Sequence, residues 1–470
     1  MIKFVLNNQT IETNLPAGTT VLDFVRYHKN LKGTKIGCRE GDCGACTVLI
    51  GELSDEALRY RSMTSCLMPL ANAHGKHVVT VEGINKADGE LTAVQQAMVD
   101  ESGTQCGFCT VGFVMSLTGF CVDETEKSTE MSISSIDGNI CRCTGYKSIE
   151  RAAERISGQL SVVSDQLSVV DGQKSALESA VEKEIVPAYF LAIKERLVAL
   201  KQSNVRPLTT DTRPLFVGGG TDLYVQRPDD MVEAAAENLF DDSGLRGIRE
   251  AGDRIEIGAS ATVTDLLVSP IFQRIFPNLY KHLKLVSSTP IRNMATLAGN
   301  FVNASPIGDM TAWFLALDAT IVFNHERELA LKDLYLGYKT LAKTADEFIT
   351  KIRIPKDVQH FNFEKVSKRT FLDIASVNTA IFLKTDGNSI TEAHASAGGV
   401  APIPLYLAKT SRFLRGREIS RETIAQAGEI AQTEISPISD VRGAAEYKRL
   451  LLRQLFAAHF VELFGIESEL

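Results

Sequence analysis

The 470-residue chain lacks any apolar run long enough to cross a bilayer, which takes about 20 residues. The longest candidates, 111–122 and 311–323, are interrupted by Ser, Thr or Asp, so we expect both to be core segments. Residues 1–6 also lack the basic and apolar regions of a signal peptide. These absences predict a cytoplasmic protein that does not associate with a membrane.

Positive charge is not in excess either. The chain has 50 Lys and Arg against 58 Asp and Glu, which gives a net charge of −8. A mildly acidic chain has no electrostatic footprint for nucleic acid or an anionic membrane, so neither is expected as a partner. The hydrophobic content of 44% is that of a soluble globular protein, and the length allows three or four domains.

Cysteine is absent from the whole chain after Cys143, and all nine cysteines lie between Cys38 and that residue. A disulfide framework would spread across a secreted chain, whereas clustering in a cytosolic chain indicates metal or redox chemistry.

The first cysteine set has the spacing C-x4-C-x2-C followed by a distant fourth cysteine. It consists of Cys38, Cys43, Cys46 and Cys66. This is the plant-type [2Fe–2S] spacing, and interspersed glycines allow the backbone to fold closely around a cluster. The alternative is a zinc site, but zinc sites usually pair two short hairpin spacings, so the sequence predicts a [2Fe–2S] cluster.

The second set combines C-x2-C with C-x-C and consists of Cys106, Cys109, Cys141 and Cys143. Cys-x-Cys cannot face one way on a regular helix, so we expect it on a turn or helix start. Cys106 and Cys109 are three residues apart and can share a helix face. A second iron–sulfur cluster is favoured over zinc. The leftover Cys121 is expected to be an ordinary buried thiol.

A glycine loop follows a strand-like run at 216–222, Phe-Val-Gly-Gly-Gly-Thr-Asp. Successive backbone N–H groups in such a loop can bind a pyrophosphate, although glycine-rich turns more often bind nothing. The loop is not G-x-G-x-x-G, which disfavours a Rossmann domain.

The local patterns also predict secondary structure. Alternation predicts a hairpin over 2–15, and strands are expected near 47–50, 78–81, 255–259, 349–355, 381–384 and 394–397. Helices are expected from residue 20, through much of 91–156, and over 423–433 and 444–464. A near-duplication of seven residues at 159–165 and 166–172 is expected to be a linker without function.

Taken together, G-C-x-E-G-x-C-G-A-C, Q-C-G-F-C-T and G-N-x-C-R-C-T-G-Y resemble the iron–sulfur portion of the xanthine dehydrogenase and aldehyde oxidase family of molybdenum hydroxylases. The segments 290–300 and 304–309 are similar to part of the FAD site of that family. Val111 stands where the family usually has proline, and Leu372 stands where the family's loop beside the flavin has aspartate.

The resemblance implies an α+β multidomain fold. Its parts are a β-grasp ferredoxin-like domain (1–86), a four-helix [2Fe–2S] domain (87–158), a linker (159–184), an α/β FAD-binding domain of the molybdenum hydroxylase type (185–360) and a C-terminal α+β flavoprotein domain (361–470).

The implied cofactors are two [2Fe–2S] clusters and one FAD. The expected FAD contacts are Leu215, Phe216, Val217, Gly218, Gly219, Gly220, Thr221, Asp222, Thr296, Leu297, Ala298, Gly299, Asn300, Asp309 and Lys365. Asp309 is expected to accept a hydrogen bond from a ribityl or ribose hydroxyl, because like charges keep it from phosphate. Lys365 is expected to favour an anionic reduced flavin through its positive charge.

The implied function is that of the electron-transfer subunit of a purine hydroxylase that converts xanthine to urate. Electrons would come from a molybdenum–pterin centre on a large partner subunit, in an expected heterotetramer, and reach NAD+ through FAD. No catalytic residue for hydroxylation is expected in this chain. The alternatives are the same subunit of a hydroxylase for aldehydes or N-heterocycles, a stand-alone iron–sulfur flavin reductase, and a redox sensor. The substitution at Leu372 leaves NAD+ and oxygen open as acceptors.

Overall fold

The computed structural model describes residues 1–54, 57–164, 174–201 and 215–466. The chain forms two compact units. The first unit comprises Met1–Asn238 together with Ser288–Met294, and the second comprises Leu239–Ser287 and Ala295–Leu470. No helix in the described ranges is long and apolar enough to span a bilayer. The expected core segments 111–122 and 311–323 are indeed mostly buried.

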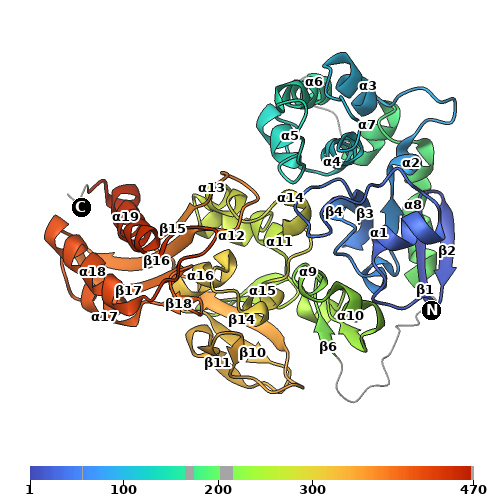
Figure 1. Ribbon diagram of the computed structural model, residues 1–470. Coiled ribbons are helices and arrows are strands. Elements are labelled where there is room, and N and C mark those ends of the chain that lie inside the picture. Colours follow the sequence, from blue (N-terminus) through green and yellow to red (C-terminus); the bar gives the residue numbers. More distant parts are fainter. Residues whose placement is uncertain (55–56, 165–173, 202–214, 467–470) are drawn as a thin grey trace. The chain divides into compact units, whose positions relative to one another are not determined.

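The first unit begins with a five-stranded mixed sheet of order β2-β1-β5-β3-β4 (Figure 1). Its strands are β1 (Ile2–Leu6), β2 (Gln9–Thr13), β3 (Thr47–Ser54), β4 (Ala57–Thr64) and β5 (His77–Val79). β1 runs antiparallel to β2 and parallel to β5, so the predicted hairpin is confirmed and extended across the sheet. Thr20 caps the following helical turns, α1 (Val21–Asp23) and η1 (Phe24–His28), because its Oγ1 accepts a hydrogen bond from the Asp23 N–H at 3.1 Å. The short elements η2 (Leu70–Ala73) and α2 (Val81–Ile84) flank β5.

A second domain of the same unit contains the four expected helices. They are α3 (Ala93–Asp100), α4 (Thr110–Val122), α5 (Thr129–Ser135) and α6 (Lys147–Ser164). α4 is buried on all sides from Gly112 to Val122, which explains its uniformly apolar sequence and its place at the centre of the bundle. A capping box between Thr92 and Gln95 begins α3.

The expected linker 159–184 is partly helical. α6 continues to Ser164, and α7 (Ala176–Glu182) begins at a capping box. Residues 165–173, which include the whole second copy of the repeat, lie outside the described residues. The stretch η3 (Ala188–Ala192) and α8 (Ile193–Lys201) was expected in the FAD domain. In the structure, Ile193 and Leu197 of this stretch bury their side chains against Val5 of β1 in the first unit.

The first unit ends with β6 (Leu215–Val217), α9 (Leu223–Gln226), α10 (Pro228–Glu233) and β7 (Ala236–Asn238). β6 and β7 form a two-stranded parallel sheet. The short helix α14 (Thr289–Arg292) also lies in this unit, although it is surrounded in sequence by residues of the second.

The second unit opens with a five-stranded sheet of order β11-β10-β14-β9-β8. Its strands are β8 (Ile248–Ala251), β9 (Arg254–Gly258), β10 (Thr320–Phe323), β11 (Glu328–Ala330) and β14 (Ile349–Pro355). Its helices are η4 (Ser243–Leu245), α11 (Val263–Leu267), α12 (Pro270–Ile275), α13 (Leu279–Lys284), α15 (Leu297–Asn303), α16 (Asp309–Ala316) and η5 (Leu331–Asp333), with β12 (Tyr335–Gly337) and β13 (Thr340–Leu341) as a small hairpin.

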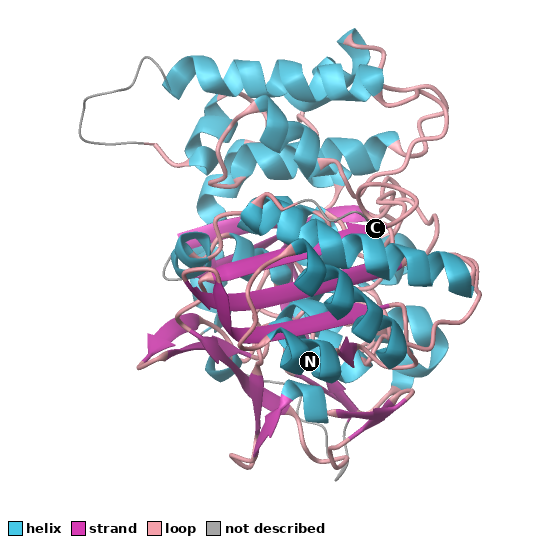
Figure 2. Ribbon diagram, turned by 90° about the vertical axis from the view of Figure 1, so that its left-hand side faces the viewer, coloured by secondary structure: helices cyan, strands magenta, loops and turns pink. Residues whose placement is uncertain are grey.

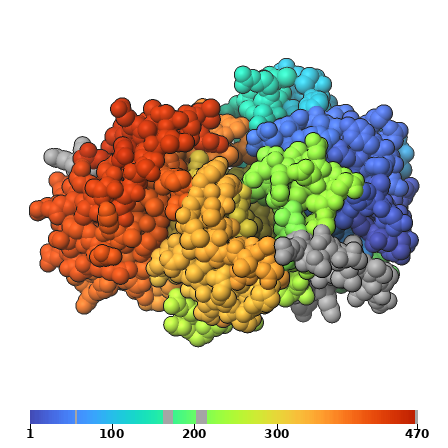
Figure 3. Space-filling model, turned by 60° about the horizontal axis from the view of Figure 1, so that its bottom comes forward, coloured from blue at the N-terminus to red at the C-terminus, as the bar shows by residue number. Residues whose placement is uncertain are grey.

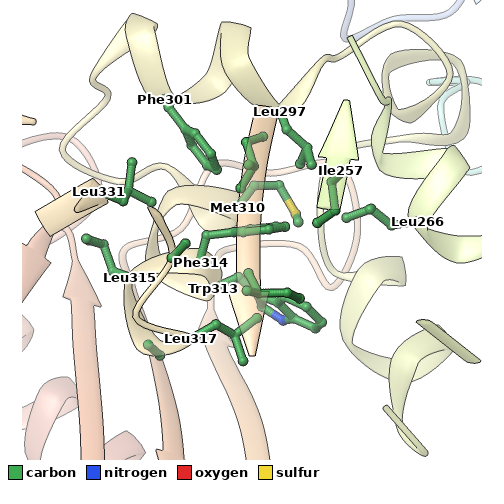
Figure 4. Packing of buried hydrophobic residues seen from close by; sticks show 14 of the residues in the cluster. Ile257, Leu266, Leu297, Phe301, Met310, Trp313, Phe314, Leu315, Leu317 and Leu331 are labelled. Carbon is green, nitrogen blue, oxygen red and sulfur yellow. The ribbon is translucent and has the colours of Figure 1, made fainter. Parts of the chain in front are cut away.

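Helix α16 forms the centre of this core, and Figure 4 shows its side chains among those of neighbouring elements. Every residue from Met310 to Ala316 is buried. The Trp313 ring lies 4.4 Å from the Phe361 ring and 4.6 Å from the Phe276 ring, measured between centroids. Each such aromatic pair stabilises the core by about 1 kcal/mol beyond its buried area.

The remaining residues of the second unit form the sheet β15-β16-β17-β18, whose strands are β15 (His360–Val366), β16 (Val377–Asp386), β17 (Ser389–Gly398) and β18 (Leu405–Tyr406). Its helices are α17 (Ala408–Leu414), α18 (Arg421–Glu434) and α19 (Ala445–Phe464), and Figure 2 shows them lying over the long strands. The orange and red segments of this unit form a continuous surface in Figure 3.

A buried polar network joins α19 to this sheet. Asn362 accepts a hydrogen bond from His282 Nε2 at 3.0 Å and donates one to His459 Nδ1 at 3.0 Å, while His459 Nε2 donates to Thr379 Oγ1 at 2.9 Å. Burial lowers the pKa of His459 to about 3 and that of His282 to about 4. Both rings are therefore neutral. For His459 the hydrogen bond agrees, since a proton on Nδ1 would face the Asn362 amide group, which is itself a donor.

This network makes the stability of the second unit depend on pH. An unfolded histidine has a pKa of about 6.5, so below that pH the unfolded state binds protons that the folded state does not bind. The stabilisation is complete above pH 6.5 and is lost as the pH falls toward the folded pKa. Between pH 6.5 and 5 we expect His459 alone to account for about 2 kcal/mol of lost unfolding free energy.

His459→Gln should flatten this pH dependence, since glutamine can keep a neutral acceptor and donor. The measurement is denaturant unfolding at several pH values. His325→Gln is the matched control, because the His325 side chain is 62% exposed. An unchanged slope in His459→Gln would contradict the assignment.

Candidate functional site

The first cysteine set occupies the loop between η1 and β3, with Cys66 just after β4. Gly41 and Gly44 have φ of +81° and +66°, a backbone conformation that glycine adopts without strain. A side chain on Gly44 would collide with the Gly138 carbonyl oxygen at 2.3 Å. The glycines between the cysteines therefore serve both the sharp turns of this loop and its close contact with another segment.

The thiols of this set lie in pairs and accept hydrogen bonds from backbone N–H groups. The N–H groups of Glu40 and Cys43 point at Cys38 Sγ from 3.3 and 3.4 Å. A hydrogen bond from the Cys43 thiol lowers the pKa of Cys38 to about 5. A hydrogen bond from Cys66 likewise lowers the pKa of Cys46. Such N–H groups stabilise thiolate, the form that binds metal.

The second set is built from two loops of the helical domain. Cys109 is the N-cap residue of α4, and Gly107 has a φ of +80°, so Cys106 and Cys109 precede the helix instead of sharing its face as expected. Cys141 and Cys143 lie in the irregular loop before α6, as predicted. The Thr144 hydroxyl and N–H donate to Cys141 Sγ at 3.1 and 3.4 Å.

The thiols of the second set also form two pairs. The Sγ atoms of Cys143 and Cys106 are 3.8 Å apart, and Cys141 hydrogen-bonds Cys109. Burial, followed by this hydrogen bond, raises the pKa of Cys109 to about 12. Within the described residues, no three His, Cys, Asp or Glu side chains converge on one point that could hold a single ion. Four thiols around one point are what structural zinc needs, whereas two pairs fit two irons with two thiolates each. The paired donor sets thus fit [2Fe–2S] clusters.

The two cysteine segments contact each other directly. The Ile140 N–H donates to the Cys43 carbonyl at 3.0 Å, and Asn139 Nδ2 donates to the Gly44 carbonyl at 3.1 Å. Ser116 of α4 holds the Asn139 amide through a 2.7 Å hydrogen bond. Asn139 belongs to the motif G-N-x-C-R-C-T-G-Y, but its hydrogen-bond partner Gly44 lies 95 positions away and could not be predicted from the motif.

The glycine loop follows β6 as predicted, and α9 begins after Asp222. A side chain on Gly219 would meet the Met294 carbonyl oxygen at 1.9 Å, and one on Gly220 would meet the Leu67 carbonyl oxygen at 2.9 Å. Asn72 Nδ2 donates to the Gly218 carbonyl at 3.2 Å. At two of the three glycines, neighbouring backbone atoms of the same chain therefore leave no room for a side chain. The loop lies directly against Leu67, the residue that follows Cys66.

Thr296–Asn300 begins helix α15 in the second unit. The N–H groups of Leu297 and Ala298 donate to the carbonyls of Ala261 and Ala259, and the Gly299 N–H donates to Thr296 Oγ1. These N–H groups are therefore already bonded within the protein. Gly299 is exposed, and a side chain there would meet only the Thr296 hydroxyl, so a ligand can approach its backbone closely.

Asp309 and Lys365 form a buried ion pair, with side chains 12% and 1% exposed. Lys365 Nζ donates to Asp309 Oδ2 and to the Leu285 carbonyl, each at 2.7 Å. Asn378 Nδ2 donates to Asp309 Oδ1 at 2.5 Å, and Asn378 Oδ1 is buried with no hydrogen-bond partner among the described residues. The positive charge expected to favour an anionic flavin is therefore balanced by Asp309. Asn378 is a further polar residue of this cluster that the sequence did not indicate.

The loop containing Leu372 is held by an ion pair between Arg369 and Asp373. The Arg369 N–H also donates to Asp373 Oδ2 at 3.0 Å. Leu372 has a φ of +73°, a conformation that is costly for leucine and better tolerated by aspartate.

Four family models match consecutive parts of the chain. They are the 2Fe-2S iron-sulfur cluster binding domain (residues 4–71), the [2Fe-2S] binding domain (80–154), the FAD binding domain in molybdopterin dehydrogenase (195–357) and the CO dehydrogenase flavoprotein C-terminal domain (363–463). Xanthine dehydrogenase of Emericella nidulans is 31% identical and matches 89% of this chain and 35% of its own length. Xanthine dehydrogenase of Blastobotrys adeninivorans is 28% identical, with 98% and 40% covered.

The chain belongs to the molybdenum hydroxylase family. It contains the iron–sulfur and FAD domains of that family and spans well under half the length of the two relatives. Among solved structures, a carbon monoxide dehydrogenase from Hydrogenophaga pseudoflava is 25% identical, with a TM-score of 0.49 over 52% of this chain and 88% of the other. The multidomain α+β fold expected from the sequence is confirmed.

Loss of one thiol should remove one cluster and leave the other. We expect Cys46→Ser and Cys109→Ser each to reduce the bound iron and acid-labile sulfide to about half, since each set of four thiolates holds one cluster. Cys121→Ser is the control, because Cys121 is buried and burial raises the pKa of its thiol to about 12. Zinc in the purified protein, or loss of all iron from either single variant, would contradict two independent [2Fe–2S] sites.

The Asp309–Lys365 pair also yields a stability prediction. Lys365→Met leaves a buried carboxylate without its partner and should lower the unfolding free energy by about 3–5 kcal/mol, whereas Asp309→Leu combined with Lys365→Met should lose considerably less. Denaturant unfolding of both variants checks this, and additive losses would show that the two charges do not compensate each other.

Proposed function

We propose that this chain is the electron-transfer subunit of a xanthine dehydrogenase. In this proposal the eight cysteines of the two sets hold two [2Fe–2S] clusters, and residues 215–222 and 296–300 with Asp309 and Lys365 contact FAD. When bound, the clusters supply one-electron transfer and FAD supplies the exchange between single electrons and a hydride. The residues of this chain hold, insulate and order these groups.

The observation that supports the proposal most is the order of contacts within the first unit. The second set touches the first through Ile140 and Cys43, and the first set touches the glycine loop through Leu67 and Gly220. The three binding segments thus form a series, with the first cysteine set in the middle. A series is what transfer from a remote centre through two clusters to a flavin requires.

The exposure of the thiols gives this series a direction. Cys106 and Cys143 are exposed, whereas Cys141 and both Cys46 and Cys66 are buried. The exposed pair is therefore the edge at which electrons enter, and we propose that a molybdenum-binding large subunit docks there, in a heterotetramer. A stand-alone reductase has no use for this exposed second set.

Xanthine is proposed as the partner's substrate because the two relatives above are named xanthine dehydrogenases. NAD+ is proposed as the acceptor. Leu372 adopts a left-handed backbone conformation although it stands where the family has aspartate. The Arg369–Asp373 ion pair holds this loop, and we propose that the acceptor binds beside it, next to the flavin.

An anaerobic optical titration tests this proposal. The chain would be purified with the partner that it retains and mixed with xanthine in the absence of other acceptors. We expect bleaching of the flavin and iron–sulfur bands, followed by recovery on addition of NAD+.

The other outcomes separate the parts of the proposal. Bleaching by NADH but not by xanthine would keep the cofactors and the NAD+ site and exclude xanthine as substrate. Recovery with oxygen but not with NAD+ would exclude the proposed acceptor. A colourless protein would overturn the cofactor assignment itself.

A further inference from the structure

Residues 288–294, here called the 288–294 segment, leave the second unit and join the first. Most of these residues belong to the stretch 290–300, which resembles part of the FAD site of the family. In the structure they contact the helical domain, the ferredoxin-like domain and the glycine loop, all within the first unit.

The contact with the helical domain is a buried ion pair. Arg292 Nη2 donates to Asp137 Oδ2 at 2.6 Å, and the two side chains are 4% and 3% exposed. The Thr289 N–H donates to the other oxygen of Asp137 at 2.7 Å. Both carboxylate oxygens are satisfied by the 288–294 segment, so Asp137 is fixed by it.

Asp137 is followed directly by the residues that link the cysteine sets. A side chain on Gly138 would lie 2.7 Å from Pro290 Cδ and 3.0 Å from Ser288 Cβ. Asn139 and Ile140 then donate to the first cysteine loop, and Cys141 comes next. The second cysteine set is thus held on one side by the 288–294 segment and on the other by the first set.

The same segment contacts the first cysteine loop. A side chain on Gly41 would lie 2.7 Å from both Ile291 Cδ1 and Leu67 Cδ1, so these two side chains cover the backbone of Gly41 together. The Gly41 N–H is a hydrogen-bond donor to the Cys66 thiol. Asn293 Nδ2 donates to the Ser62 carbonyl of β4, the strand that leads to Cys66, at 2.8 Å.

We propose that the 288–294 segment is a positioning element for both iron–sulfur sites. Asp137 and Arg292 fix the segment to the loop before Cys141, and Ile291 shields the first cysteine loop from water. The segment thereby sets the distance between the two clusters and keeps the reduction potential of the first cluster low. This inference rests on the cluster ligands of the proposed function, but not on the substrate or the acceptor.

Two small substitutions separate these effects. Gly138→Ala inserts a methyl group against Pro290 and should shift the loop before Cys141. Ile291→Ala uncovers Gly41 and should admit water to the first cluster. Water stabilises the additional negative charge of a reduced cluster, so the potential of the first cluster should rise while that of the second stays unchanged.

The measurement is electron paramagnetic resonance of the holoprotein during reduction with dithionite. We expect Gly138→Ala to lose or diminish the magnetic splitting between the two reduced clusters, because dipolar coupling falls with the cube of their distance. Ile291→Ala should raise the potential of one cluster only. Gly158→Ala in α6 is the matched control, since a side chain there meets nothing within 4 Å, and it should change neither quantity.

Unchanged splitting and potentials in both variants would overturn the inference and leave the proposed function intact. The inference would equally fail if Asp440→Asn, which removes the partner of the buried Lys448 in the second unit, reproduced the spectral changes at a similar loss of melting temperature. Absence of both cluster signals from the wild-type protein would overturn the proposed function as well. If Gly138→Ala does not accumulate, Arg292→Lys keeps the buried charge and serves in its place, with the same expected loss of splitting.

Discussion

The close approach of two backbones at Gly44 is the constraint on which the first unit depends. A side chain at Gly44 would meet Gly138, and a side chain at Gly112 of α4 would meet the Gly44 carbonyl at 2.2 Å. Three glycines from three segments therefore create the space in which Asn139 and Ile140 donate to the first cysteine loop. An alanine at Gly44 or Gly112 would force these segments apart, whereas an alanine at Gly138 would collide with Pro290 and Ser288. The glycines of the cysteine motifs thus serve packing between domains at least as much as the turns of their own loops.

Buried charge supplies the second organising feature of the chain. Asp137–Arg292 and Asp309–Lys365 are both almost fully excluded from water, and each charge is compensated by a partner far away in sequence. Burying such a pair gives little net stability compared with apolar side chains, but removing one partner is expensive. Pairs of this kind therefore specify arrangement more than they add stability. Both occur next to segments with an expected role in cofactor binding, where arrangement matters.

Local patterns in the sequence predicted much of the fold. The alternation at 2–15 became the hairpin β1–β2, and the apolar run at 111–122 became the buried helix α4. The cysteine spacings likewise indicated the residues that the structure brings together in pairs. These predictions succeeded because each depends on residues that are neighbours in sequence. Contacts between distant residues could not be predicted in this way, and the buried contact of Ile193 and Leu197 with Val5 is an example. Asp309, the partner of Lys365, lies 56 residues away, so the local sequence pattern could not indicate that the charge of Lys365 is balanced.

Gly107 and Leu372 show how one backbone angle can alter a functional prediction. The spacing of Cys106 and Cys109 suits a helix face, yet the positive φ of Gly107 places both thiols ahead of α4, in a loop that can wrap around a cluster. Leu372 adopts a similar left-handed angle without the glycine or aspartate that tolerates it well. The next residue, Asp373, is anchored to Arg369 by an ion pair, so the loop is held directly beside this strained position.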